Sequence, residues 1–315
     1  MALSRPETGM FRSIINDHAI VRGVLRTTDL GYIAFGNDAL LANHDEHSLF
    51  LVYHQGNWIW PTNQDRSDWT TTSATVVTAP KIQALFMGLY GQIFRVGSGD
   101  VSEESALQHL QDGPSSFGPM RCICAVEGRA YAVGMGRQAY RRLDQNRWER
   151  IDHTCRSSLE TNNTYSFESM HGLVESNIFA AGRCGEVWKF DASEWTQEAS
   201  ATLNVLTDIR VLTNGEVLAC GLDGTLVERT ATGWIVVAHD ITVDDFMSIC
   251  EFKGRVYVST MNDVYEYTDR SIVPVDFGTD RPQTFFCLSA AGDAMWSVGA
   301  KSIYSFDGAT WQRIL

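Results

Sequence analysis

The feature that most restricts the fold is a repeat of about 40 residues in which a glycine, a turn, an apolar strand, a second turn and a tryptophan follow in order. The clearest copy runs from Gly182 to Trp195, and the last copy ends the chain at Trp311. The leading glycine occurs at Gly134, Gly182, Gly221 and Gly299. These positions are 48, 39 and 78 residues apart, and the last interval is twice 39. The spacing predicts a row of equivalent units rather than one irregular core.

The double interval predicts one more copy near residue 260. The alternating apolar segment from Val256 to Tyr267 supplies it, with Thr260 in place of the glycine. Each unit reads as four short strands, because turn dipeptides such as Asn214-Gly215 separate its apolar runs. The segment from Trp311 to Leu315 supplies a fourth strand, so the last unit is complete without help from the N-terminus.

Counting both clear and divergent copies gives seven units, which start near residues 31, 73, 121, 168, 207, 247 and 286. Residues 100–104 are either a fourth strand or the start of a short helix. The first unit is interpreted as strands over Tyr32–Phe35, Ala39–Ala42, Leu49–Tyr53 and Trp58–Trp60. The sequence therefore predicts an all-β fold, a seven-bladed β-propeller of four-stranded antiparallel blades over residues 31–315. Residues 1–30 are left as an N-terminal extension or a ring-closing segment.

Charge and cysteine content restrict the classes of partner. The formal net charge of −13 disfavours nucleic acid and anionic membranes and favours a basic protein, although solubility alone also accounts for it. Five of the seven cysteines fall in apolar, strand-like runs, which predicts free thiols and a cytoplasmic protein. Residues 1–17 lack the apolar core of a signal peptide, and no apolar run is long enough to span a membrane.

The repeat resembles bacterial β-propeller repeats with the pattern G-x-x-G-x-[IV]-x-x-[FY]-D-G-x-x-W. The matching residues are Gly182, Gly185, Val187, Phe190, Asp191 and Trp195, and in the last copy Gly299, Ile303, Phe306, Asp307, Gly308 and Trp311. The resemblance covers residues 120–315 best and implies the fold, but no function. Residues 305–311 also look like an Asp-box one residue short. A sialidase would need an arginine cluster and a tyrosine nucleophile, and no spacing singles these out.

No catalytic constellation is distinguishable in the sequence, so no catalytic residue and no cofactor are predicted, and enzymatic activity is disfavoured. His44 and His47 have the spacing of metal ligands, but a solvated hairpin between two strands is the favoured interpretation. Arg183 and Cys184 stand out at a hairpin tip, because the other copies place different residues there.

Loop length predicts which face is functional. Several connections between blades are long, namely residues 61–72, 105–120, 152–166 and 276–284, and in a propeller they share one face with the hairpins between second and third strands. Tolerated insertions are the alternative interpretation. Acidic residues with aromatic or methionine anchors are typical of a protein interface. The predicted partner-binding residues are Asp65, Asp68, Trp69, Tyr165, Arg183, Asp223, Asp244, Asp245, Met261, Asp263 and Asp280.

The leading hypothesis is a monomeric, non-catalytic propeller that binds a basic protein through this acidic face, as an inhibitor or an immunity protein for a toxin. The alternative is a glycan-binding or glycan-processing propeller with its site at the mouth of the central channel. A structural assembly module is a third possibility, and it would form a stable homo-oligomer.

Overall fold

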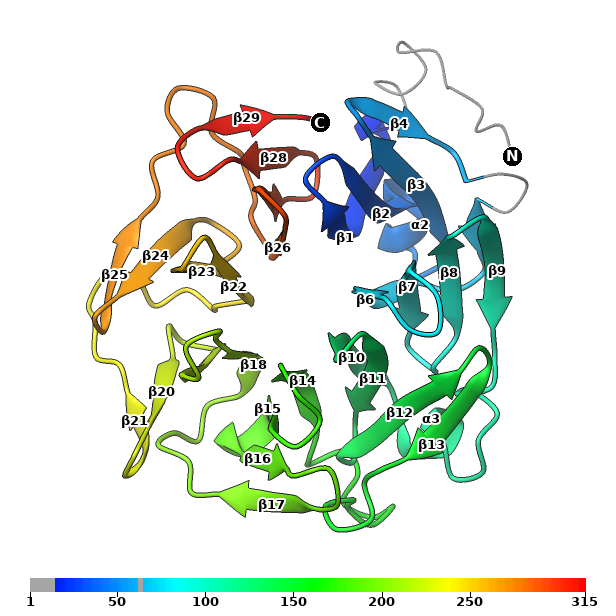
Figure 1. Ribbon diagram of the computed structural model, residues 1–315, viewed down its shortest axis with the longest axis vertical. Helices are drawn as coiled ribbons and strands as arrows, with labels where there is room; N and C mark the ends of the chain where they lie inside the picture. Colours follow the sequence, from blue (N-terminus) through cyan, green and yellow to red (C-terminus); the bar gives the residue numbers. More distant parts are fainter. Residues whose placement is uncertain (1–14, 62–64) are drawn as a thin grey trace.

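The computed structural model, which describes residues 15–61 and 65–315, is a ring of seven blades around a central channel (Figure 1). Each blade is an antiparallel sheet whose strands follow in chain order from the channel to the rim. The innermost strands are β1 (His18–Thr27), β6 (Thr71–Val77), β10 (Met120–Val126), β14 (Phe167–Gly172), β18 (Leu206–Val211), β22 (Ser248–Phe252) and β26 (Cys287–Ala291). The predicted seven-bladed propeller is confirmed.

The other three strands of each blade lie progressively further from the channel. The second strands are β2 (Leu30–Asn37), β7 (Gln83–Gly88), β11 (Arg129–Gly134), β15 (Ile178–Gly182), β19 (Val217–Gly221), β23 (Arg255–Ser259) and β27 (Ala294–Val298). The third strands are β3 (Ser48–His54), β8 (Ile93–Gly97), β12 (Gln138–Asp144), β16 (Val187–Phe190), β20 (Leu226–Thr230), β24 (Val264–Thr268) and β28 (Ile303–Phe306). The outer strands are β4 (Asn57–Ile59), β9 (Asp100–Glu104), β13 (Arg147–Arg150), β17 (Trp195–Glu198), β21 (Gly233–Val236), β25 (Ser271–Pro274) and β29 (Trp311–Arg313).

The core lies between the blades, because each sheet buries both faces against its neighbours. Among the described residues the buried apolar side chains form seven clusters, one at each junction between adjacent blades. The tryptophan of the repeat belongs to this layer. Trp195 packs its ring 5.1 Å from that of Phe190 and donates its indole N–H to the carbonyl of Ile151 in the preceding blade. The repeat therefore encodes the contacts that join one blade to the next.

The glycine of the repeat is required by close packing of the backbone. A Cβ atom on Gly182 would lie 1.7 Å from the carbonyl oxygen of Ser166, and one on Gly299 would lie 2.0 Å from that of Thr284. No side chain can be accommodated at such distances without moving the connection that enters the blade. Where the glycine is present, it thus lets the connection between blades pack against the end of a second strand.

The first blade differs from the sequence-based interpretation. Its innermost strand is β1, which comes from residues assigned to the N-terminal extension, and the predicted strand Tyr32–Phe35 lies within the second strand, β2. The predicted strand Ala39–Ala42 is wrong, because these residues form the helix α2 (Asp38–Ala42). The Asn37 side chain caps α2 by accepting the N–H groups of Ala39 and Leu40. Residues 1–14 of the proposed extension lie outside the described residues.

Ring closure rests on packing between complete blades. All four strands of the last blade, β26–β29, come from the C-terminal end of the chain, as predicted. Trp296 is fully buried at this junction and lies against Gly31 of the first blade, where a Cβ would come within 2.2 Å of the indole ring. The Ile20 N–H donates to the Ala300 carbonyl at 2.8 Å, and Lys301 contacts Asp38. Among the described strands, none is exchanged between the two blades.

Candidate functional site

One face of the ring carries the connections between blades and the hairpins between second and third strands. The chain reverses at every strand, so both kinds of connection emerge on the same side. They include α2, the helix α3 (Pro114–Phe117) and the 3₁₀ turn Arg183–Gly185. The hairpins of the opposite face are shorter, such as Lys253-Gly254 between β22 and β23. We call the first side the long-loop face.

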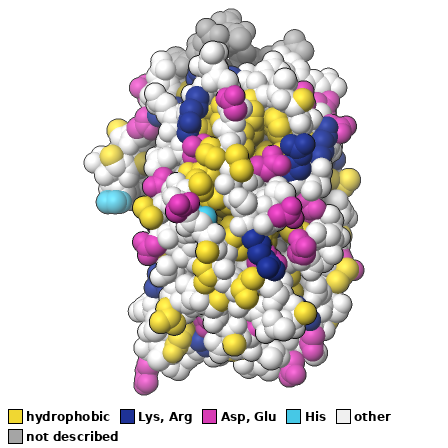
Figure 2. Space-filling model, turned by 90° about the vertical axis from the view of Figure 1, so that its left-hand side faces the viewer, with side chains coloured by type: hydrophobic (Ala, Val, Ile, Leu, Met, Phe, Trp, Pro, Cys, Tyr) yellow, Lys and Arg dark blue, Asp and Glu magenta, His cyan; other side chains and the backbone are white. Residues whose placement is uncertain are grey.

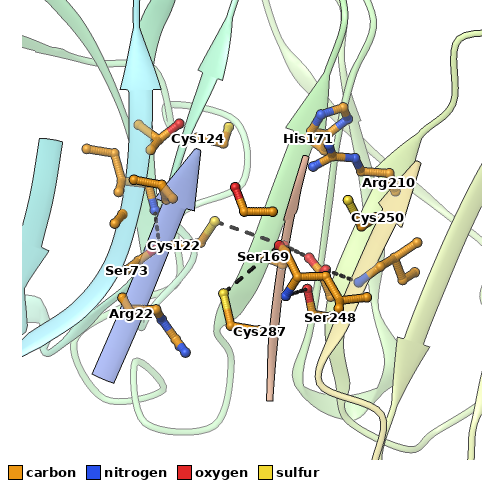
Figure 3. Close-up of a pocket in the computed structure, with 18 of the residues that line it drawn as sticks. Arg22, Ser73, Cys122, Cys124, Ser169, His171, Arg210, Ser248, Cys250 and Cys287 are labelled. Atoms are coloured by element: carbon orange, nitrogen blue, oxygen red, sulfur yellow. Dashed lines mark hydrogen bonds between the residues drawn. The ribbon is translucent and has the colours of Figure 1, made fainter. Parts of the chain in front are cut away.

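The channel along the ring axis is lined by the innermost strands and has a volume of about 370 Å³. Arg22, Arg121 and Glu168 lie near its mouth on the long-loop face. His171 and Arg210 lie close together at the other end, on the opposite side from Arg22 (Figure 3). Between these ends the lining is made of small polar side chains and cysteines, including Ser73, Cys122, Ser169, Ser248 and Cys287. The channel is therefore polar along its length.

The polar side chains of the middle layer hold neighbouring blades together. Each of four accepts a backbone N–H from the innermost strand of the next blade, at 2.7 to 3.3 Å. The acceptor and donor residues are Ser73 and Ile123, Asp208 and Ile249, Ser248 and Leu288, and Ser289 and Leu25. Strands on the channel wall have no strand partner on their inner side, so these bonds satisfy N–H groups that the sheets leave free. Their presence gives the channel residues a structural role.

Asp208 and His171 are the titratable groups most affected by this environment. Burial raises the pKa of Asp208, while hydrogen bonds from the Ser169 hydroxyl at 2.6 Å and the Ile249 N–H at 2.7 Å oppose the rise. Burial, and then the charge of Arg210, hold the pKa of His171 well below its usual value. Its Nδ1 accepts the Val211 N–H at 3.1 Å, so the neutral ring carries its proton on Nε2. Both side chains are thus engaged with the backbone of the wall.

Glu168, at the mouth of the channel on the long-loop face, lies between two arginines. Glu168 lies 3.4 Å from Arg121 and 3.3 Å from Arg183, and Arg183 also donates to the Asn163 carbonyl at 2.8 Å. Arg22 donates to the Thr72 carbonyl at 2.7 Å. The predicted site residue Arg183 therefore braces the turn it occupies, rather than standing free on the surface.

The cysteines of the channel are protonated thiols. All seven cysteines are unpaired, and burial raises the pKa values of Cys122, Cys250 and Cys287, and that of Cys124 well above the usual range. A raised pKa lowers the thiolate fraction and with it the reactivity. Cys184 is exposed on the long-loop face, in the left-handed region at φ 60°.

All eleven residues predicted to bind a partner lie in connections of the long-loop face. Asp65, Asp68 and Trp69 flank the short strand β5 (Arg66–Ser67), which pairs with β3. The others lie in the connections that enter β14, β16, β20, β22, β24 and β26. Two of the aspartates form ion pairs, Asp65 with Arg66 at 3.2 Å and Asp263 with Arg281 at 2.9 Å. Their placement on one face agrees with the loop argument, and their role in binding stays a prediction.

The predicted anchors differ in exposure. Trp69 is only 3% exposed and packs against Phe50. Tyr165 lies beneath Arg137, whose guanidinium carbon is 4.0 Å from its ring centroid. Met261 is 43% exposed and does offer its side chain to solvent. Trp69 is therefore covered and Tyr165 is half-buried, and the role of both in binding stays a prediction.

The histidine pair between α2 and β3 is a structural feature. His44 is exposed at φ 60°, while His47 uses both ring nitrogens. Its Nε2 accepts the Asn37 N–H at 2.7 Å, and its Nδ1 lies 2.8 Å from the Asp45 carbonyl. His47 therefore fastens the connection to the end of β2. No group of three or more metal-ligating side chains occurs in the described part of the chain.

Exposed aliphatic residues on the long-loop face were missed by the sequence reasoning. Leu203 and Val243 are 85% and 84% exposed, in the connections that enter β18 and β22. The only available signal was their position in polar, aspartate-rich segments without the alternation of a strand. A hollow of about 670 Å³ also opens at the channel mouth. Its lining includes Met247, Met261, the acidic pair Asp244 and Asp245, and the arginines Arg22 and Arg121.

The rim of the ring carries mixed charges. On the side of blades five to seven, Figure 2 shows acidic side chains dispersed among lysines and arginines, with a band of apolar side chains in the upper half. A second hollow lies on the rim between the last two blades, lined by Val273, Val275, Phe306 and Trp311 among others. The acidic side chains therefore do not form one continuous negative surface on this side.

A comparison with curated proteins finds a relative that matches almost end to end. The chain is 39% identical over 298 residues to the "Immune protein Tsi7" of Pseudomonas aeruginosa. The match covers 93% of this chain and 96% of the relative. No family model matches, so the resemblance to bacterial propeller repeats stays a prediction.

Solved structures support the fold alone. The chain resembles "YCF48 bound to D1 peptide" with a TM-score of 0.65 at 12% identity, covering 92% of this chain and 91% of that one. It also resembles the WD40 β-propeller domain of Doa1 with a TM-score of 0.63 at 10% identity, over 94% and 92% of the two chains. No helix among the described residues is long and apolar enough to cross a membrane.

Proposed function

The chain belongs to the family of the immune protein Tsi7, and from this premise we propose that it is an immunity protein that neutralises a toxin by binding it. The observation that carries the proposal is the 39% identity, because it extends over 93% of the chain and therefore covers the long-loop face as well as the blades. Binding rather than catalysis is the proposed mode of action.

The proposed binding surface is the long-loop face, with a basic toxin surface as its partner. The formal net charge of −13 supports a basic partner, since opposite charge accelerates encounter and disfavours wrong partners. The eleven residues predicted from the sequence all lie in connections of this face. A propeller supplies a rigid scaffold for such loops, which limits the ordering entropy lost on binding.

We also propose that the chain acts as a monomer in the cytoplasm. All seven cysteines are unpaired, and several are fixed in the channel wall, where a reducing compartment preserves them as thiols. A monomer leaves the whole long-loop face available to the toxin.

The test is protection of cells from the protein encoded beside this chain's gene. That protein is expressed with and without the chain, and survival is scored together with 1:1 binding of the purified pair by calorimetry. We expect survival only with the chain, and a dissociation constant in the nanomolar range or below, as is usual for tight inhibitory complexes. Absence of both binding and protection would overturn the proposal.

A further inference from the structure

Two large aliphatic side chains stand almost fully in solvent at matching places in consecutive blades. Leu203 lies three residues before Leu206, the first residue of β18, and Val243 lies three residues before the buried Phe246 that precedes β22. Each connection passes over a glycine in the preceding blade's hairpin: a Cβ on Gly185 would meet the Leu203 backbone at 3.1 Å, and one on Gly224 would meet that of Val243 at 3.2 Å. The fold therefore presents both side chains from equivalent positions.

Further exposed apolar residues lie in the same or neighbouring connections of this face. Ile241 belongs to the same connection as Val243, Met247 follows it at the channel mouth, and Met261 lies in the next hairpin. We call Leu203, Ile241, Val243, Met247 and Met261 the apolar patch. Contiguous exposed apolar side chains rimmed by polar ones mark interaction sites in soluble proteins. Two methionines add adaptable side chains that fit irregular partner surfaces.

The connections of the patch do not use these side chains for their own stability. The Gly224 N–H donates to the Asp244 carbonyl at 3.2 Å, and the Phe246 N–H donates to the Gly221 carbonyl at 3.0 Å. The Thr207 hydroxyl donates to the Phe246 carbonyl at 2.6 Å. Hydrogen bonds of the backbone therefore fix the loop, while the aliphatic side chains remain unburied.

Carboxylates without ionic partners surround the patch. Asp223, Asp240, Asp244 and Asp245 form no ion pair within the described residues, although Asp244 accepts the Asn262 amide at 2.9 Å and Asp245 accepts the Asp223 N–H at 2.9 Å. A second copy of this chain would place these charges against one another, so the patch disfavours self-association. A partner surface with lysine or arginine around an apolar centre complements both features.

We propose that the apolar patch, with its four surrounding aspartates, is the docking site for a basic toxin surface. The inference rests on the proposed function and narrows it to the sector of blades five and six. It assigns Leu203 and Val243 as the central anchors and gives the aspartates the role of steering the encounter. Interfaces concentrate their binding energy in a few central side chains, which single substitutions can locate.

The experiment uses the full chain and the purified protein encoded beside its gene. Leu203→Asp and Val243→Asp place a charge on the patch, and Val273→Asp on the outer strand β25 is the matched control, since Val273 is also a valine exposed to solvent. We expect each patch variant to weaken binding about tenfold or more and the double variant about a hundredfold. Val273→Asp should bind like the wild type. Circular dichroism and thermal unfolding establish that all variants are folded.

A second arm addresses the charges. The quadruple variant Asp223→Asn, Asp240→Asn, Asp244→Asn and Asp245→Asn should lower the association rate constant about tenfold at low salt. The difference should shrink at high salt, where screening removes the steering in both proteins. A folded quadruple variant with an unchanged rate would overturn the steering role.

The outcomes separate this inference from the proposed function. Loss of binding in the patch variants with retention in Val273→Asp supports the docking site. Wild-type binding and protection with unaffected patch variants overturn the docking site and leave the immunity function standing. Failure of the wild-type chain to bind or protect overturns the proposed function, and the docking site with it.

Discussion

The long-loop face has two parts that treat charge and apolar surface in opposite ways. Over blades three and four, residues 105–119 and 152–166 are braced against the blades by half-buried arginines. Arg137 binds Glu186 at 2.8 Å and covers Tyr165, while Arg156 covers Phe117 at 3.8 Å and donates to the Asp112 carbonyl. Over blades five and six, shorter connections leave Leu203 and Val243 in solvent and, within the part of the chain that the structure describes, four aspartates without an ion pair.

The difference between the two parts shows where, among the described residues, side chains are left without a partner inside the protein. In the braced part Phe117, Tyr165 and Glu186 pack or pair within the chain, so they contribute to stability and offer little to a partner. In the sector of blades five and six, aliphatic side chains and carboxylates remain available. Long loops therefore mark a structural brace in this protein, and the shorter connections carry the surface that a partner can use.

The largest expected effect on stability comes from breaking the ion pair between Arg137 and Glu186. Glu186→Gln removes the charge of a buried carboxylate from the half-buried Arg137 and also weakens the bond from the Trp188 indole. Removal of one partner from a buried ion pair costs about 3–5 kcal/mol. The free energy of unfolding, measured with urea, should fall by that amount.

The matched control is Asp65→Asn, which removes the exposed ion pair with Arg66 on the same face. An exposed pair contributes under about 1 kcal/mol. Equal losses of unfolding free energy in Glu186→Gln and Asp65→Asn would show that the arginines do not brace residues 105–119 and 152–166.

A smaller effect on stability is expected from substitution of Asp191, the aspartate of the repeat, which lies on the face opposite the long-loop face. Asp191 accepts the Ser193 hydroxyl and the N–H groups of Ser193 and Glu194, which lowers its pKa to about 2. Because the folded pKa is depressed, its stabilisation is present above the ordinary pKa of about 4 and is lost as the pH falls toward 2. Asp191→Asn should therefore be less stable than the wild type at pH 7, and the gap should close between about pH 4 and pH 2.

The control for this turn is Asp240→Asn in the sector of blades five and six, which should leave the free energy of unfolding at pH 7 unchanged. Thermal unfolding across the pH range checks both variants. A gap between the wild type and Asp191→Asn that persists below pH 2 would show that the carboxylate charge is not what stabilises the turn.

The smallest expected effect on the protein is that of chemical labelling at Cys184, which lies between the two parts of the long-loop face. Cys184 is exposed, whereas burial raises the pKa of each of the other six cysteines. A thiol-specific reagent should modify about one thiol per folded chain, seven after unfolding, and none quickly in Cys184→Ser. Rapid modification of a second thiol in the folded protein would show that the channel cysteines are accessible.

The repeat allowed the architecture to be predicted from the sequence. Gly182, Asp191 and Trp195 are local and periodic, because each serves the same close approach, turn or junction in every blade where it recurs. The first blade was misread because the glycine and tryptophan of the repeat mark second and outer strands and leave the innermost strand β1 unmarked. The Asn37 cap also favours a helix where apolar residues suggested a strand. The fourth strand β9, left open between strand and helix, is a strand.

The sequence by itself determined the ring, its number of blades and the face that carries the long loops, since these follow from residues that recur at fixed intervals. Only the tertiary structure decided which side chains on that face remain free. Trp69 has the composition of an anchor but is covered, while Leu203 and Val243 look like ordinary loop residues and are exposed. The physical reason is that exposure depends on how loops from different blades fold over one another, and no repeat within one blade records that contact.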